Sequence, residues 1–152
     1  MNTIKELQDT VNAGECAQES LNRIAETIYD TYLEELKFQQ EKLAKEFPSY
    51  AFGDHEISPL QRNLNRGFYS YRIIGDNLIL TGQDYFRGET DYESDTLPAS
   101  FFIDDENERV RLITAFVSEK IISVRNRLKE KAEQEEAEEK RQYEYLKEKF
   151  KS

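Results

Sequence analysis

Cysteine, histidine and tryptophan are almost missing from this sequence of 152 residues, which contains one Cys, one His and no Trp. A single thiol, Cys16, cannot form an intramolecular disulfide, and this favours a reducing compartment. The single histidine, His55, has no second His or Cys pair with which to complete a zinc site, so we expect no metal ion. Ser-His-Asp arrangements, phosphate-binding Gly-rich loops and thiol motifs are missing too. The sequence therefore predicts a protein that is not an enzyme and holds no cofactor.

Long hydrophobic runs are also missing. No stretch approaches the roughly 18 apolar residues that a membrane-spanning helix needs, and acids occupy the first residues, where a signal peptide would have its apolar core. We therefore expect a cytoplasmic protein that does not enter a membrane. Basic charge is scarce as well, because the net charge is −10. This balance argues against direct binding to duplex nucleic acid.

Proline and glycine are few, with three Pro and six Gly, so little in the chain forces a helix to stop. Apolar residues recur at steps of three and four along residues 1–47, which is typical of amphipathic helices with coiled-coil character. We expect a short helix over 3–12, an interruption at Asn12-Ala13-Gly14, and a long helix over 15–46. Pro48 ends this region, because the residue before a proline is pushed out of helical geometry.

Residues 104–152 predict a second long helix. It begins at a capping box, in which Asp105 accepts from the amide of residue 108 and Glu108 reaches back to residue 105. Its apolar stripe thins out after Leu128, although helix-forming residues continue almost to the end. Tyr143 and Phe150 belong to a second, small apolar patch that needs a partner surface from this chain or another.

The middle of the chain, residues 48–103, is rich in Tyr, Phe, Gly and Asp. Segments 68–74, 78–81 and 89–97 predict strands of an antiparallel sheet, of which the second could extend through 85–86. Turns are expected at 75–77 and 87–88, and a short strand is expected at 50–52. The chain is therefore a single α+β domain, 1–152, with N-terminal helices over 1–47, a three- to four-stranded sheet region over 48–103 and a long C-terminal helix over 104–152. The helices favour a homo-oligomer.

The acidic excess lies outside the C-terminal helix. Residues 1–47 have a net charge of −5, residues 48–103 of −4 and residues 104–152 of −1. In the middle region the densest acidic group comprises Asp84, Glu89, Asp91, Glu93 and Asp95, of which the last four alternate along a predicted strand and so share one face. The group lacks the order of an EF-hand loop. It suits either protection of a sheet edge against aggregation or imitation of the phosphate row of a nucleic acid.

We therefore predict an acidic, non-enzymatic interaction protein, an inhibitor or adaptor that uses these five acids against a basic, nucleic-acid-binding surface of a partner protein. Two alternatives stay open. The sheet could bind a nucleotide or other anionic small molecule, there or at an oligomer interface, through Arg66, Tyr71, Arg72 and Arg87. The long C-terminal helix could instead serve a structural assembly factor. Small size, acidity and the lack of catalytic motifs are also typical of phage accessory proteins.

Overall fold

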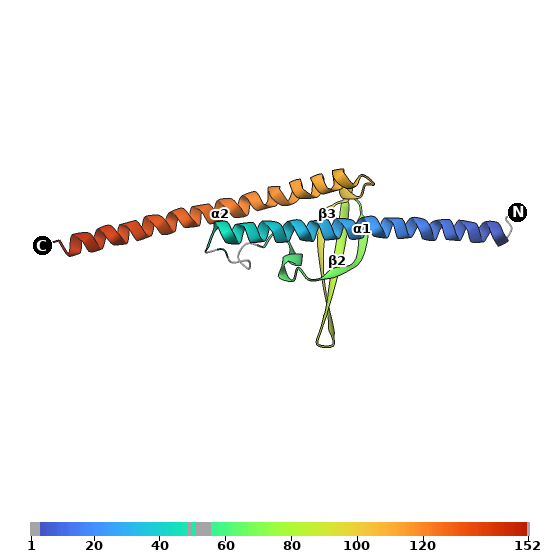
Figure 1. Ribbon diagram of the computed structural model, residues 1–152, viewed down its shortest axis with the longest axis horizontal. Helices are drawn as coiled ribbons and strands as arrows, with labels where there is room; N and C mark the ends of the chain where they lie inside the picture. The colour runs from blue at the N-terminus through green and yellow to red at the C-terminus, as the bar shows by residue number, and fades with distance from the viewer. Residues whose placement is uncertain (1–3, 49, 51–55, 152) are drawn as a thin grey trace.

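A computed structural model describes residues 4–48, 50 and 56–151, with the side chains of residues 7, 10 and 11 left aside. The chain forms two long helices and a small antiparallel sheet, so the predicted α+β class is confirmed (Figure 1). The elements are α1 (Ile4–Glu46), the short 3-10 helix η2 (Pro59–Arg62), β1 (Gly67–Ile74), β2 (Asn77–Phe86), β3 (Glu89–Pro98), the short η3 (Ala99–Phe101) and α2 (Glu106–Lys149). Residues 51 and 52 of the strand expected at 50–52 and the histidine at position 55 lie outside the described residues, and residue 50 belongs to no strand.

The first helix is continuous. The expected interruption at residues 12–14 is wrong, because α1 runs unbroken through Gly14. A glycine inside a helix costs only about 1 kcal/mol relative to alanine, and helix-forming residues on both sides of Gly14 tolerate that cost. A glycine ends a helix when it adopts a left-handed conformation, and Gly14 has no positive φ.

The two long helices run in the same direction and are staggered along their length (Figure 1). Later residues of α1 contact later residues of α2, as parallel helices require. The Tyr32 ring lies 6.4 Å from that of Phe116, and further on Glu46 pairs with Arg125 at 3.4 Å. The overlap buries one stripe of each helix, and this stripe supplies much of the core, namely Ile28, Tyr29, Tyr32, Leu36, Leu43, Ile113, Val117, Ile121, Val124 and Leu128. Parallel neighbours are possible because the intervening sheet returns the chain to the point where α2 begins.

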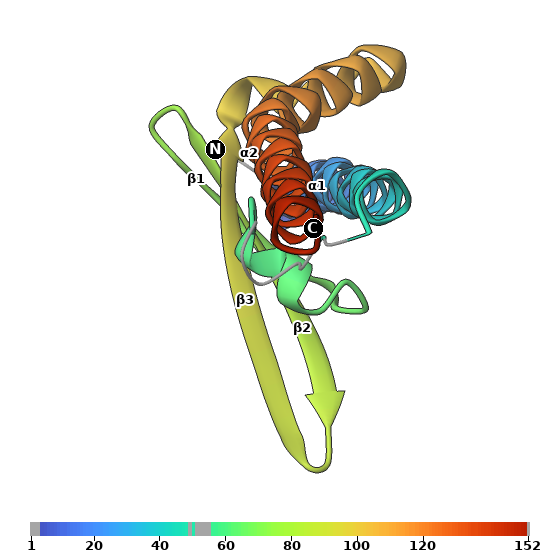
Figure 2. The same ribbon diagram turned by 90° about the vertical axis from the view of Figure 1, so that its left-hand side faces the viewer.

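The sheet has the order β1-β2-β3 and lies on one side of the helix pair (Figure 2). Burial alternates along β2, where Leu78, Leu80 and Gly82 are buried and the residues between them are half-buried. The inner face therefore packs on the helices. The β2–β3 hairpin continues past the helices and projects from the body (Figure 1). Its turn has positive φ at Arg87 and Gly88, as a tight hairpin turn requires.

Each long helix extends beyond the overlap, at opposite ends of the molecule (Figure 1). Every residue of α1 before Ile24 whose side chain is described is exposed, and so is every described residue after Leu128. The start of α2 agrees in part with the predicted capping box. Asp105 accepts a hydrogen bond from the Glu108 amide at 3.1 Å, whereas the Glu108 side chain pairs with Arg111 on the next turn.

Candidate interaction surfaces

The predicted acidic row on β3 lies on one strand face, and this face is turned toward the protein's own polar groups. Asp95 accepts a hydrogen bond from the Tyr32 hydroxyl of α1 at 2.5 Å. Burial, and then the charge of Asp95, raise the pKa of the Tyr32 hydroxyl, so it stays protonated and donates. Asp95 therefore connects the sheet to the helix core.

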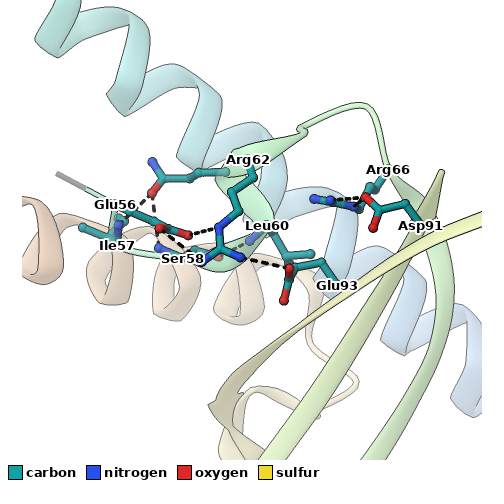
Figure 3. A network of polar contacts seen from close by, with 9 residues as sticks. Glu56, Ile57, Ser58, Leu60, Arg62, Arg66, Asp91 and Glu93 are labelled. Carbon is teal, nitrogen blue, oxygen red and sulfur yellow. Dashed lines mark hydrogen bonds and ion pairs between the residues drawn. The ribbon is translucent and has the colours of Figure 1, made fainter. Parts of the chain in front are cut away.

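Glu93 and Asp91, the next two members of the row, pair with arginines that precede the sheet (Figure 3). Arg62 of η2 lies between two carboxylates, with Nε 2.9 Å from Glu56 and Nη1 3.3 Å from Glu93. Arg66 donates to Asp91 from Nη2 and, at 3.2 Å, from Nε. Two of the negative charges that the sequence offers to a partner are thus already opposed by charges of this chain.

The two remaining acids of the predicted surface are Asp84 and Glu89, both on the β2–β3 hairpin. Asp84 faces Asp91 across the β2–β3 ladder, and its carboxylate accepts from the Asn63 amide at 2.6 Å. Glu89 is exposed beside the hairpin turn. Of the five acids, four therefore have polar partners within the chain, and Glu89 extends from the tip.

The four residues proposed for an anionic ligand are dispersed. The Arg66 side chain is 6% exposed and paired with Asp91. Tyr71 stacks on Phe102 with ring centroids 5.5 Å apart, and its hydroxyl accepts from Gln18. Arg72, the next residue along β1, is exposed, and Arg87 lies at the distant hairpin turn over the Phe86 ring. Tyr71 and Arg72 both line a surface hollow along β1, but Arg66 and Arg87 do not, so the four side chains do not converge on one pocket.

A different set of acids is open to solvent, on the outer side of α1. Glu26, Asp30 and Glu34 follow one another at steps of four residues, are all exposed, and form no ion pair within the described part of the chain. Burial, and then the neighbouring Glu26 and Glu34 charges, raise the pKa of the Asp30 carboxyl above its usual value. We call Glu26, Asp30 and Glu34 the α1 acidic ladder.

The sequence contained a signal for this ladder. Residues 24–36 contain four acids and no Lys or Arg, and a spacing of four places side chains on one helix face. One turn beyond Glu34 stands Phe38, whose side chain is 56% exposed. It lines a shallow surface hollow with Glu41, Lys42 and Lys45. The outer side of α1 thus combines unpaired carboxylates with an uncovered aromatic ring.

Neither a cluster of metal ligands nor a membrane-spanning helix is found among the described residues. No three His, Cys, Asp or Glu side chains come together there to hold a metal ion. Neither long helix has a stretch of sufficient length and apolarity to cross a bilayer, as far as the structure describes them. Comparison of the chain with protein-family models, with curated proteins and with solved structures found no match.

Proposed function

We propose that this protein is a non-enzymatic interaction protein that binds a basic surface of a partner protein through the α1 acidic ladder. The observation that carries the proposal is the arrangement of Glu26, Asp30 and Glu34, which lie in sequence on an exposed helix face without ion pairs among the described residues. In its specific form the protein is an inhibitor or adaptor, and the partner's basic surface is one that binds nucleic acid.

The ladder is unfavourable for the isolated protein. Like charges four residues apart destabilise a helix by about 0.2–0.5 kcal/mol per pair, and the Glu26 and Glu34 charges add to the larger effect of burial in raising the pKa of Asp30. The helix bears this cost because its opposite face is buried, with Ile28 and Leu36 fully covered. A basic partner would convert the repulsion into attraction, since each carboxylate then faces a cation.

Phe38 gives the surface an apolar contact beside its charges. Aromatic residues are enriched among the positions that dominate binding energy, whereas surface charges mainly accelerate and orient association. The exposed Phe38 ring, one helical turn from Glu34, therefore adds an apolar contact that can contribute binding energy beside the steering effect of the charges. The outer part of the hairpin is a second acidic surface that the same partner could reach. It presents Glu89, which is exposed, and Asp91, which is 60% exposed although it pairs with the buried Arg66.

A pull-down with matched baits tests the proposal. The test bait carries Asp30→Asn and Glu34→Gln, which remove charge without changing side-chain size. The control bait carries Glu106→Gln and Glu119→Gln, two exposed acids of α2, so both baits change the net charge equally. We expect the wild-type and control baits to capture the same basic proteins from a lysate, and the test bait to lose them.

Two further results would count against the proposal. Equal capture by all three baits would remove the ladder from the binding surface. Loss of capture by a Glu89→Gln bait, with capture retained by the ladder variant, would move the binding surface to the hairpin tip. Circular dichroism and urea unfolding of each bait ensure that any loss reflects the surface and not the fold.

A further inference from the structure

The end of α1 leaves one face of α2 uncovered. Where α1 stops, a hollow lies between the two helices, and its lining combines the apolar residues Phe47, Pro48 and Ala132 with the carboxylates of Glu135 and Glu139. The same face of α2 is occupied by α1 up to this point, since Leu128 is buried in the shared core. Any helix that enters the hollow would therefore continue the packing that α1 begins.

The uncovered part of α2 has two halves of opposite charge. Residues 129–139 contain six acids and two bases, a net charge of −4, and residues 140–151 contain two acids and five bases, a net charge of +3. We call them the acidic half and the basic half of the tail. Because these charges are separated along one helix, the tail is complementary to a second copy of itself only when the copies run in opposite directions.

The basic half also has the larger apolar residues. Tyr143, Leu146 and Phe150 follow one another at steps of three and four and are 67%, 49% and 77% exposed. They extend the stripe that α1 covers earlier, because Leu128, Ala132, Glu135 and Glu139 lead to Tyr143 with the same steps. Apolar groups of the basic half could therefore meet the apolar residues beside the end of α1.

We propose that two copies of this chain pair through their α2 tails, antiparallel about a two-fold axis near residue 140. In this arrangement the basic half of each copy lies along the acidic half of the other, over about 20 residues or about 30 Å of helix. Phe150 of the second copy reaches the hollow beside Phe47 and Pro48. The pairing is isologous, so it closes at two copies.

Charge fixes the direction of this pairing. A parallel arrangement would place the two acidic halves together and the two basic halves together, which is unfavourable along the whole contact. In the antiparallel arrangement the acidic half of each copy, with a net charge of −4, faces the basic half of the other, with a net charge of +3. This arrangement also brings Lys149 and Lys151 of the second copy to the C-terminal end of α1, where the helix dipole favours positive charge.

Charge reversal with rescue, read by light scattering after size-exclusion chromatography, tests the pairing on the full chain. We expect a dimer for the wild type and a dissociation constant raised on the order of tenfold for Glu133→Lys with Glu139→Lys. Adding Arg141→Glu and Lys147→Glu to the same chain should restore the dimer, because an axis near residue 140 places residue 133 opposite residue 147 and residue 139 opposite residue 141. The control Glu19→Lys with Glu119→Lys changes the net charge equally at exposed positions outside the tail and should leave the dimer unchanged.

Single cysteine substitutions on a Cys16→Ser background show whether the two tails pair in antiparallel or in parallel orientation. Under mild oxidation Glu139→Cys should cross-link to itself across the axis, whereas Phe150→Cys should not. A monomeric wild type at every concentration overturns the proposal, as does a dimer that survives the tail reversal. Efficient self-cross-linking of Phe150→Cys would mean parallel tails and would overturn it too. All the changed residues are exposed, and unchanged urea unfolding would exclude misfolding as the cause.

Discussion

The substitution Gly82→Ala should destabilise the protein more than the same change at any other glycine that the structure describes, because Gly82 lies directly beneath a buried tyrosine. A Cβ atom at this position would collide with the Tyr29 hydroxyl and would lie 3.0 Å from Cζ of that ring and 3.1 Å from Cβ of Arg66. The Tyr29 hydroxyl cannot easily move, since it is buried and donates a hydrogen bond of 2.8 Å to the Arg66 carbonyl. The methyl group therefore either displaces the ring or pushes β2 away from α1.

The size of the effect follows from these two contacts. Loss of the hydrogen bond costs about 1 kcal/mol, and overpacking of a filled core typically costs about 1–3 kcal/mol. The sum is about 2–4 kcal/mol, a large part of the roughly 5–15 kcal/mol that holds a domain folded. With a denaturant slope of about 2 kcal/mol/M in urea, the unfolding midpoint should fall by about 1–2 M.

A double-mutant cycle in urea measures the contact directly. Tyr29→Phe removes the hydroxyl, so Gly82→Ala should cost markedly less in that background than in the wild type. Gly67→Ala is the matched control, because a Cβ at that β1 position meets nothing within 4 Å. A change of less than about 0.5 kcal/mol for Gly82→Ala, which is what an ordinary surface substitution gives, would refute the packing described between β2 and α1.

Two further predictions concern the charged groups. Asp91→Asn should lower the free energy of unfolding by about 1–3 kcal/mol, as measured in urea. This is less than the cost for a fully buried pair, because Asp91 is 60% exposed although Arg66 is 6% exposed. The control Glu89→Gln should change stability by less than about 0.5 kcal/mol, and an equal effect of the two substitutions would contradict the pairing. Asp30 has a raised pKa, so the folded state holds its proton more tightly than the unfolded chain, and stability is lost as the pH rises from the unfolded pKa through the folded one. Asp30→Asn should therefore stabilise the protein by roughly 0.4–1 kcal/mol near neutral pH, and this gain should vanish near about pH 3; a gain that is independent of pH would contradict the repulsion.

Local patterns in the sequence were sufficient to predict most of the fold. Alternation and turn residues placed the three strands correctly, because a hairpin depends on neighbouring residues and on turns such as Arg87-Gly88. Steps of three and four placed both long helices. The expected break near Gly14 was wrong because one poor helix former cannot outweigh its many helix-forming neighbours.

The surroundings of the acids could not be predicted in the same way. Alternation correctly put the β3 acids on one face, but it says nothing of what lies opposite that face. Arg62 and Arg66 come from the segment before the sheet, and a tertiary arrangement brings them to Glu93 and Asp91. The parallel stagger of the helices is likewise a property of the assembled core. Because of this stagger, the α1 acidic ladder and the α2 tail are not covered by the other helix.

The most direct test of the central claim is the salt dependence of binding between the full chain and a basic protein captured by it. The account predicts that affinity falls as ionic strength rises, since exposed charges are screened. Asp30→Asn with Glu34→Gln should weaken binding at low salt and flatten this dependence, and Glu106→Gln with Glu119→Gln should leave both unchanged. The same affinity and the same salt dependence for wild type and ladder variant would contradict the claim that α1 presents the binding surface.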